Sequence, residues 1–327
     1  MRGMIALALI LAFGVRAAMS VKPQPSDSDR DVPSAARAET SSADSGLPLW
    51  VRRVVRALAT IGGVLAALVV LVLIFENRFI YYPTRHPGGD WDHPQPGVTD
   101  CWIETADGLK LHAWWMPGAD PGRGPVMLWF HGNAGNLTHR AENLAMLKRH
   151  GPGVLIVDYR GYGKSQGHPS EKGLYLDGEA AHRHLTQELG VAPGRIVCFG
   201  RSLGCAVALH VALERPAAGL ILESPFADAR SMARRMLPVI PLWPFVRSDF
   251  DNIGRIPQLR VPVLVLHGSR DGIVPFQQGR AVFEAAPQPK EFYRIEGAGH
   301  NDTYLAGGEP YFAKLIDFCN GCVAGAK

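Results

Sequence analysis

The sequence predicts an α/β fold, in which helices cover both faces of a mostly parallel central sheet. From about Phe79 onward, short apolar runs of strand length alternate with longer segments of helical periodicity. In addition, the pentapeptide Gly200-Arg201-Ser202-Leu203-Gly204 joins the apolar run 196–199 to a helical pattern of small residues. A serine on a sharp turn between a strand and a helix is typical of a nucleophile held above a parallel sheet.

The composition is compatible with one large enzyme domain and gives little support to other classes. The 327 residues suffice for an α/β domain of about 250 residues plus extra segments. The formal net charge is only +4, and no basic stripe is interleaved with aromatic residues, so we expect no nucleic-acid partner. We also expect no metal or other cofactor, because His182 and His184 are two positions apart and would leave a helix on different faces.

The five cysteines do not describe a disulfide framework for a chain of this length. Cys319 and Cys322 form a lone CxxC near the C-terminus, without a second pair that would complete a zinc site. We interpret them as ordinary cysteines of the tail, and a local disulfide remains the alternative.

Residues 54–76 are predicted to form a transmembrane helix. No charge interrupts the segment between Ala57 and Phe75, which is long enough at helical rise to cross a hydrocarbon core. A buried core helix is the alternative, but the polar stripe of a soluble helix is missing. The arginines before the segment, at 52, 53 and 56, favour a cytoplasmic N-terminal side. The main domain would then be extracytoplasmic, that is, periplasmic.

Residues 1–19 form a shorter apolar segment whose length is typical of the core of a signal peptide. If this segment is retained and also spans, two crossings return the main domain to the cytoplasm. If it is cleaved near Ala17 or Ala18, the helix at 54–76 is the single membrane span. A start of translation at Met19 is a third possibility. Residues 20–50 are rich in Ser, Asp, Ala and Pro and are predicted to be a disordered linker.

Within the main domain, residues 79–320, the first two strands flank Asp107-Gly108, a strong hairpin signal, so the sheet should begin antiparallel. The strands are expected at residues 98–105, 110–115, 126–130, 153–157, 195–199, 219–222, 261–266 and 291–294. The helices are expected at residues 136–150, 170–189 with Ser170 as N-cap, 203–213, 276–285 and 310–318.

Residues 225–257 do not follow this alternation of strands and helices and are predicted to form an apolar cap. They carry Met232, Met236, Leu237, Ile240, Leu242, Trp243, Phe245 and Val246. An apolar cap over the serine would favour an acyl chain or another hydrophobic group, whereas the alternative is that these side chains only pack the insertion onto the sheet.

Three residues that together form a nucleophilic site follow three of the predicted strands. Ser202 follows the strand at 195–199, Asp271 the strand at 261–266 and His300 the strand at 291–294. Carboxyl ends of parallel strands meet at one edge of the sheet, and the order serine, acid, histidine is that of the α/β-hydrolase fold. We therefore predict a catalytic triad in which His300 takes the proton of Ser202 and Asp271 orients the histidine ring.

The oxyanion of a tetrahedral intermediate also needs hydrogen-bond donors. One should be the backbone N–H of Leu203, directly after the nucleophile. We predict the second in the turn at 131–136, on Asn133, with Ala134 as second choice. A phosphate-binding loop is the competing interpretation of this turn, but it lacks the Lys and Ser/Thr of a P-loop and the spacing of a dinucleotide site.

Several ordered motifs resemble the α/β-hydrolase-domain proteins with a serine-aminopeptidase-like domain, and among them the membrane-anchored subgroup. The motifs are FIYYPTR at 79–85, HGNAGN at 131–136, the segment 158–177, GRSLG at 200–204, SPF at 224–226, HGSRDGIVP at 267–275 and GAGHND at 297–302. The resemblance implies a hydrolase that uses Ser202, Asp271 and His300 behind a membrane helix. Some relatives remove fatty acyl groups from proteins. The N-terminal segment and linker depart from the pattern, as does Glu223 before SPF, an alternative triad acid.

We therefore expect a membrane-anchored serine hydrolase that cleaves carboxylic esters or thioesters of hydrophobic acyl substrates, which are small, lipid-like or attached to a protein. A peptidase of the aminopeptidase type is the enzymatic alternative, but it would need acidic residues for the substrate amino group, and the sequence offers no clear candidate. A non-catalytic membrane scaffold is the third possibility, although all three triad residues are present.

Overall fold

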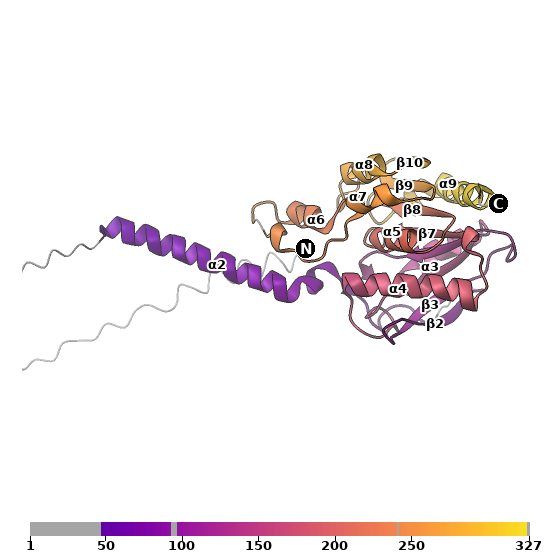
Figure 1. The fold of residues 1–327 in the computed structure, drawn as a ribbon, viewed down its shortest axis with the longest axis horizontal. Helices are drawn as coiled ribbons and strands as arrows, with labels where there is room; N and C mark the ends of the chain where they lie inside the picture. The colour runs from indigo at the N-terminus through magenta and orange to yellow at the C-terminus, as the bar shows by residue number, and fades with distance from the viewer. Residues whose placement is uncertain (1–46, 93–96, 241, 326–327) are drawn as a thin grey trace, which may run out of the picture. The chain divides into compact units, whose positions relative to one another are not determined.

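The computed structural model describes residues 47–92, 97–240 and 242–325. The predicted apolar segment at 1–19 and nearly all of the predicted linker lie outside these residues. The chain divides into two compact units, Met1–Val55 and Arg56–Lys327, and the second contains the whole sheet. This unit confirms the predicted α/β fold (Figure 1).

The central sheet has eight strands in the order β10-β9-β8-β7-β4-β6-β3-β2. β3 runs antiparallel to both of its neighbours and every other pair is parallel, so the sheet begins antiparallel as predicted. The strands are β2 (Thr99–Glu104), β3 (Lys110–Met116), β4 (Val126–Phe130), β6 (Gly153–Val157), β7 (Ile196–Arg201), β8 (Gly219–Glu223), β9 (Val263–Gly268) and β10 (Lys290–Ile295).

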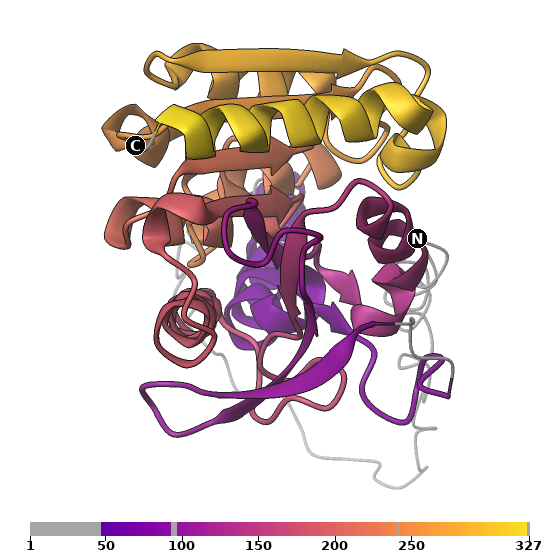
Figure 2. The same ribbon diagram turned by 90° about the vertical axis from the view of Figure 1, so that its right-hand side faces the viewer.

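The inner strands are apolar throughout because both faces of the sheet are covered. In β4, Leu128 and Phe130 pack into one core cluster, whereas Met127 and Trp129 pack into the other. The first cluster includes side chains of α4 (Glu171–Arg183), α5 (Gly204–Glu214) and α8 (Phe276–Ala285). The second includes α3 (Ala141–Lys148) and α9 (Thr303–Gly325), which lies along the strands in yellow in Figure 2.

The structure corrects several helix ends. The predicted helix at 136–150 is a 3₁₀ turn, η2 (Leu137–Arg140), followed by α3. Ser170 is the predicted N-cap of α4, and its side chain accepts from the Gly173 N–H. The last part of that predicted helix is π-helical, η3 (His184–Glu188). α9 consists of two helical parts joined at the non-helical Gly308, and the second part begins next to the predicted start at residue 310 but continues past the predicted end at 318.

One short pairing was not predicted. β1 (Tyr82–Pro83) and β5 (Ala134–Gly135) form a two-stranded parallel sheet, which places the segment after the apolar helix beside the turn at 131–136. Two residues are too few to produce a periodic signal.

The predicted membrane segment lies within a single helix, α2 (Leu49–Ile80). It is the one helix among the described residues that is long and apolar enough to cross a membrane, with a mean hydropathy of 2.9. Its large apolar side chains, among them Leu58, Ile61, Val64 and Ile74, are exposed. Leu49 and Trp50, which we placed in the linker, already belong to α2.

The last turns of α2 are hydrogen-bonded to the insertion between β8 and β9. The Glu76 carboxylate is buried and accepts from the backbone N–H groups of Arg247 at 3.1 Å and Ser248 at 2.7 Å. Arg247 Nη2 in turn donates to the Leu73 carbonyl at 2.7 Å. These bonds join the end of the apolar helix to the insertion.

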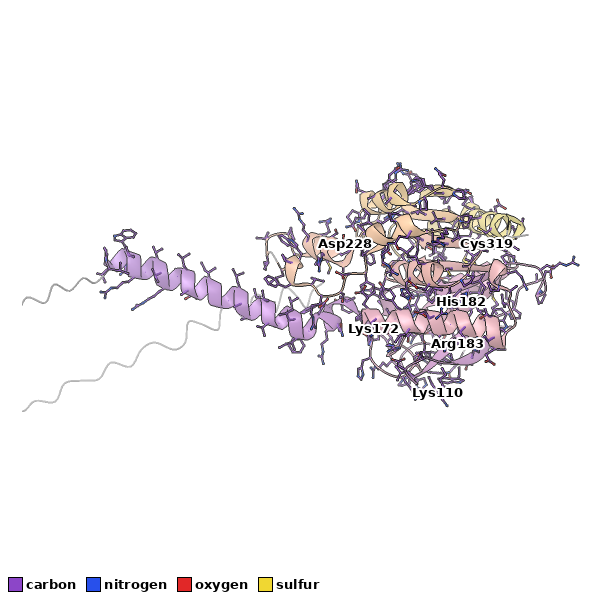
Figure 3. The ribbon with its side chains drawn as sticks, viewed as in Figure 1. Lys110, Lys172, His182, Arg183, Asp228 and Cys319 are labelled. Carbon is purple, nitrogen blue, oxygen red and sulfur yellow. The ribbon has the colours of Figure 1, made fainter. Side chains whose placement is uncertain are left out.

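The predicted cap consists of α6 (Ala229–Met236), η5 (Trp243–Phe245) and α7 (Asn252–Arg255). Asp228, labelled in Figure 3, is the N-cap residue of α6, and its side chain accepts a hydrogen bond from the Ser231 N–H. Leu242 and Val246 are buried, whereas Met236 and Phe245 are exposed. The insertion is therefore partly packed onto the domain and partly open to its surroundings.

Cys319 and Cys322 are core residues and not part of a loose tail, because α9 extends the chain past both of them (Figure 3). Both are free thiols. Burial raises the pKa of Cys322 to about 11 and raises that of Cys319 further. A Cβ on Gly219 would lie 2.5 Å from Cys322 Sγ, so the thiol packs directly against β8.

Candidate active site

Ser202 stands on the turn between β7 and α5 in the left-handed region of backbone space, with φ of 52°. For a residue other than glycine this conformation is strained, and such strain persists only where the surroundings enforce it. Here the Ser202 N–H donates to the Glu223 carbonyl at 2.9 Å, and the Ser202 carbonyl accepts from the Cys205 N–H at 3.0 Å. The predicted nucleophile thus occupies the sharp turn that the sequence indicated.

Two glycines make this turn possible. A Cβ on Gly200 would lie 2.4 Å from the Gly204 carbonyl oxygen, and a Cβ on Gly204 would lie 2.0 Å from the Phe130 carbonyl oxygen. Both contacts are with backbone, which cannot rotate away. Any side chain at either position would therefore push β7, α5 and β4 apart.

We expect Gly204→Ala to destabilise the domain by more than about 3 kcal/mol or to prevent its folding, because overpacking against backbone cannot relax locally. Gly321→Ala in α9 is the control, since a Cβ there has open space. Thermal melts followed by circular dichroism compare the two variants. Equal melting temperatures would show that the turn tolerates a side chain.

The structure brings Asp271 and His300 together. His300 Nδ1 lies 2.7 Å from Asp271 Oδ2, on loops that follow β10 and β9. Asp271 Oδ1 accepts from the N–H groups of Ile273 and Val274, which fixes the carboxylate. His300 Nδ1 thus faces a held carboxylate, and its Nε2 remains for a second partner.

A second histidine supports the acid. The buried His267 Nε2 lies 3.4 Å from Asp271 Oδ2 and 3.0 Å from the Val274 carbonyl. Burial alone would raise the pKa of Asp271, but hydrogen bonds from His267 and His300 and from the Val274 N–H hold it well below its usual range. The carboxylate is therefore charged at neutral pH. Sequence reasoning missed His267, although it opens the same motif as Asp271.

The turn at 131–136 lies against the segment that follows α2. The Asn133 side chain donates to the Ile80 carbonyl at 3.0 Å, and the Asn133 carbonyl accepts from Tyr82 N–H and Tyr162 Oη. The Asn133 carbonyl and one of its two side-chain N–H donors are thus engaged, and its backbone N–H stays the predicted donor to an oxyanion. Leu203, the other predicted donor, is a buried residue at the N-cap of α5, where backbone N–H groups have no intrahelical partner.

Ser202, His300, Asn133 and Ala134 share one cleft of about 480 Å³. Leu203 and Asp271 are not among the residues that line it. The lining residues are Tyr82, Thr84, Gly132, Asn133, Ala134, Gly135, His139, Arg140, Arg201, Ser202, Ile273, His300 and Asn301. None of the apolar cap residues is among them, so the expected apolar roof over the serine is not a feature of this cleft.

Comparison with known proteins places the chain among relatives of similar length. It is 34% identical to the α/β-hydrolase domain-containing protein WAV2 of Arabidopsis thaliana, over 79% of this chain and 91% of that protein. It is 30% identical to the human α/β-hydrolase domain-containing protein 17B, over 70% of this chain and 78% of that protein. The chain belongs to the α/β-hydrolase domain-containing family. The resemblance seen in the sequence motifs is thereby confirmed.

Two further comparisons fit this family. The family model described as serine aminopeptidase, S33, matches residues 123–250. The fold is that of the Pyrococcus furiosus esterase Pf2001, with a TM-score of 0.61 and 22% identity over 74% of this chain and 99% of that one. It is also that of an α/β hydrolase, GrgF, from a Penicillium species, with a TM-score of 0.56 and 20% identity over 69% and 99% of the two chains. Together, these comparisons support a serine hydrolase-type activity for this chain.

Glu223, the alternative acid, belongs to a different group of contacts. It is fully buried and accepts from Thr303 Oγ1 and from Tyr311 Oη at 2.7 Å, and its Oε1 lies 3.2 Å from Arg201 Nε. Arg201 also donates to the His300 carbonyl at 2.6 Å. Glu223 thus helps to fix the backbone that carries His300, whereas Asp271 contacts the imidazole itself.

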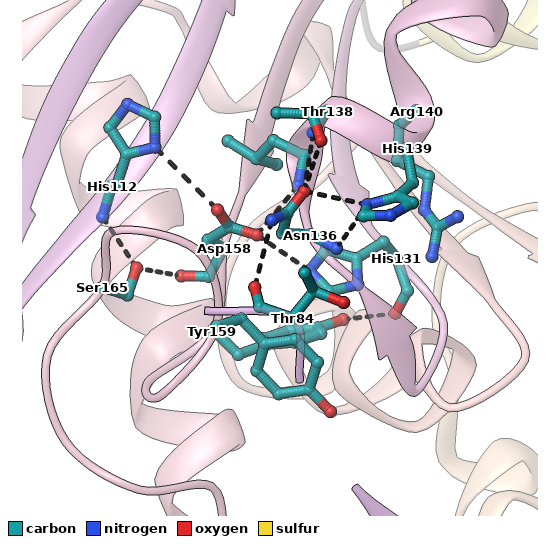
Figure 4. A network of polar contacts seen from close by, with 12 residues as sticks. Thr84, His112, His131, Asn136, Thr138, His139, Arg140, Asp158, Tyr159 and Ser165 are labelled. Atoms are coloured by element: carbon teal, nitrogen blue, oxygen red, sulfur yellow. Dashed lines mark hydrogen bonds and ion pairs between the residues drawn. The ribbon is translucent and has the colours of Figure 1, made fainter. Parts of the chain in front are cut away.

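A buried polar cluster lies behind the turn at 131–136 (Figure 4). Asp158 Oδ1 accepts from the Leu137 N–H at 3.0 Å and lies 3.6 Å from His131 Nε2, and Tyr159 Oη donates to the His131 carbonyl at 2.9 Å. Burial lowers the pKa of His131, so this ring is neutral at pH 7. The cluster holds the backbone of the turn in place. The sequence offered its members only as parts of the HGN and DYRGYG motifs.

Proposed function

We propose that the protein is a membrane-anchored serine hydrolase that cleaves carboxylic ester or thioester bonds of acyl substrates. The observation that carries this proposal is a serine held at φ of 52° in the same cleft as a histidine whose Nδ1 lies 2.7 Å from a held carboxylate. Ser202 is the nucleophile, His300 the general base and acid, and Asp271 the residue that orients and stabilises the imidazolium.

In the proposed reaction, Ser202 Oγ attacks the acyl carbon while its proton passes to His300 Nε2. The tetrahedral intermediate collapses as the leaving alcohol or thiol takes this proton, and an acyl-enzyme remains on Ser202. Water then attacks the acyl-enzyme, with its proton passing to Nε2 and back to Ser202 Oγ. The products are the carboxylic acid and free enzyme.

The negative charge that develops on the acyl oxygen needs fixed donors. We assign this role to the backbone N–H groups of Leu203 and of Asn133, with Ala134 as the alternative to Asn133. Tyr159 and Asp158 restrain the backbone of this turn, and a donor that does not reorganise during the reaction lowers the barrier most.

A hydrolysis panel on the full chain in detergent micelles tests the reaction class. It contains esters and thioesters of short to long acyl chains and amino-acid amides. We expect the esters or thioesters to be hydrolysed with a kcat/KM at least about 100-fold above that of any amide. Faster cleavage of amino-acid amides would favour the aminopeptidase type instead. No turnover together with no fluorophosphonate labelling would favour the non-catalytic scaffold.

We further propose that α2 crosses a membrane once, with the catalytic domain on the extracytoplasmic side. The exposed apolar side chains of α2 and the arginines at 52, 53 and 56 support this assignment. The protein should stay with the membrane after extraction at high pH and be digested by protease added to the extracytoplasmic face. Release at high pH would contradict the anchor, and protection from protease would place the domain in the cytoplasm.

A further inference from the structure

The cleft that contains Ser202 and His300 also contains a cation, Arg140, to which the described part of the chain offers no carboxylate partner. Arg140, the last residue of η2, lines this cleft. Its Nη2 donates to the Ala134 carbonyl at 2.6 Å, and its Nε is buried and finds no hydrogen-bond acceptor among the described residues. Within residues 47–92, 97–240 and 242–325, no carboxylate oxygen lies within 4.0 Å of its side-chain nitrogens. No dashed contact joins Arg140 to the other residues drawn in Figure 4.

The two buried arginines in the described part of the domain, Arg160 and Arg201, differ from the half-buried Arg140 in this respect. Arg160 pairs with Asp107 and Asp177, both at 2.8 Å, and Arg201 pairs with Glu223 at 3.2 Å. Buried charges in proteins are normally paired, because removing them from water is otherwise costly. Arg140 is half-buried, but its Nε is buried and has no hydrogen-bond partner among the described residues, and it lines the same cleft as the predicted nucleophile.

The electrostatic surroundings of Arg140 support the same conclusion. Burial and then the positive charge of Arg201 lower the pKa of Arg140 to about 10, although the carboxylate of Asp158 acts in the opposite direction. The guanidinium is still charged at neutral pH. An anion that enters the cleft would satisfy Nε and relieve the repulsion between the two arginines.

We propose that Arg140 binds an anionic group of the substrate, a carboxylate, sulfonate or phosphate that lies near the scissile ester or thioester bond. This inference rests on the proposed function and adds a substrate class to it. The guanidinium presents several N–H donors in a planar fork that suits the oxygens of such an anion. The hydrogen bond from Nη2 to the Ala134 carbonyl fixes the orientation of the guanidinium and uses one of its N–H donors.

Two series of substrates determine which side of the scissile bond carries the charge. In the leaving-group series, butyryl thioesters of 2-mercaptoethanesulfonate, 2-mercaptoethanol and thiocholine carry a negative, no and a positive charge. In the acyl series, adipoyl and hexanoyl thioesters of 2-mercaptoethanol differ in one carboxylate. We expect the full-length protein to show at least about a tenfold higher kcat/KM for the anionic member of one series. The series in which this occurs locates the anion.

Three variants connect the preference to Arg140. We expect Arg140→Gln to reduce the ratio of kcat/KM for anionic over neutral substrate to about one, and Arg140→Lys to keep part of it. Arg149→Gln, an exposed arginine after α3 with the same change of net charge, should keep the full ratio. Because the readout is a ratio, a general loss of activity divides out.

Each outcome decides the inference. Equal turnover of anionic and neutral substrates by the wild type, or a full ratio in Arg140→Gln, would overturn it and leave the proposed hydrolase intact. Should Arg140→Gln not fold, the wild-type series and Arg140→Lys still decide. Absence of turnover in every series, together with no fluorophosphonate labelling, would instead overturn the proposed function.

Discussion

Ser202→Ala should lower kcat/KM for the best ester or thioester substrate by at least about 1,000-fold, because the attacking oxygen is removed. The turn itself should persist. Alanine keeps the Cβ of serine, and the bonds that hold the turn use the backbone of residues 202, 205 and 223. Steady-state kinetics of the purified protein, with circular dichroism to verify folding, measure the effect.

The control for this variant is Ser231→Ala, in the insertion, where the hydroxyl donates to the Asp228 side chain. It should retain turnover within about threefold of the wild type. If the folded Ser202→Ala protein turned over substrate as fast as this control, Ser202 would not be the nucleophile.

Asp271→Asn should lower kcat by about 1,000-fold to 10,000-fold. An amide in place of the carboxylate neither fixes the productive tautomer of His300 nor stabilises its protonated form. The exposed Asp317→Asn on α9 makes the same chemical change away from the site and should be neutral. Comparable kcat values for the two variants would show that another group orients His300.

The same variant tests the charge of the acid through the pH dependence of stability. Since the folded pKa of Asp271 is depressed, its contribution is present above the unfolded pKa of about 3.9 and is lost as the pH falls toward the folded value. The difference in melting temperature between the wild type and Asp271→Asn should therefore be largest near pH 7 and should decrease below about pH 4. A difference that is constant from pH 7 to pH 3 would contradict the depressed pKa.

The strands could be predicted from sequence because both faces of the sheet are covered. Continuous runs such as 126–130 and 153–157 leave no polar position to disturb the pattern, and their ends agree with β4 and β6. Ser202, Asp271 and His300 were proposed from sequence because each follows a predicted strand, although the strand before His300 is the edge strand β10, which carries charged residues. The pairing of His300 with Asp271 then follows from the meeting of strand ends at one edge of the sheet.

Features that depend on contacts between distant segments could not be predicted in this way. Arg140 looked like an ordinary helix residue, and only the fold shows that it lies in the cleft and that no carboxylate of the described residues pairs with it. The bonds from Arg201 to Glu223 and to the His300 carbonyl join residues far apart in sequence. The apolar residues of the insertion suggested a roof over the serine, but hydrophobicity alone does not say which surface a side chain covers.

The most direct measurement of the central claim is the site of covalent labelling by a fluorophosphonate, determined by peptide mass spectrometry on the full chain in detergent micelles. We expect one adduct, on the peptide that contains Ser202, which forms more slowly in Asp271→Asn and not at all in Ser202→Ala. An adduct on another residue, or unchanged labelling of Ser202→Ala, would contradict it.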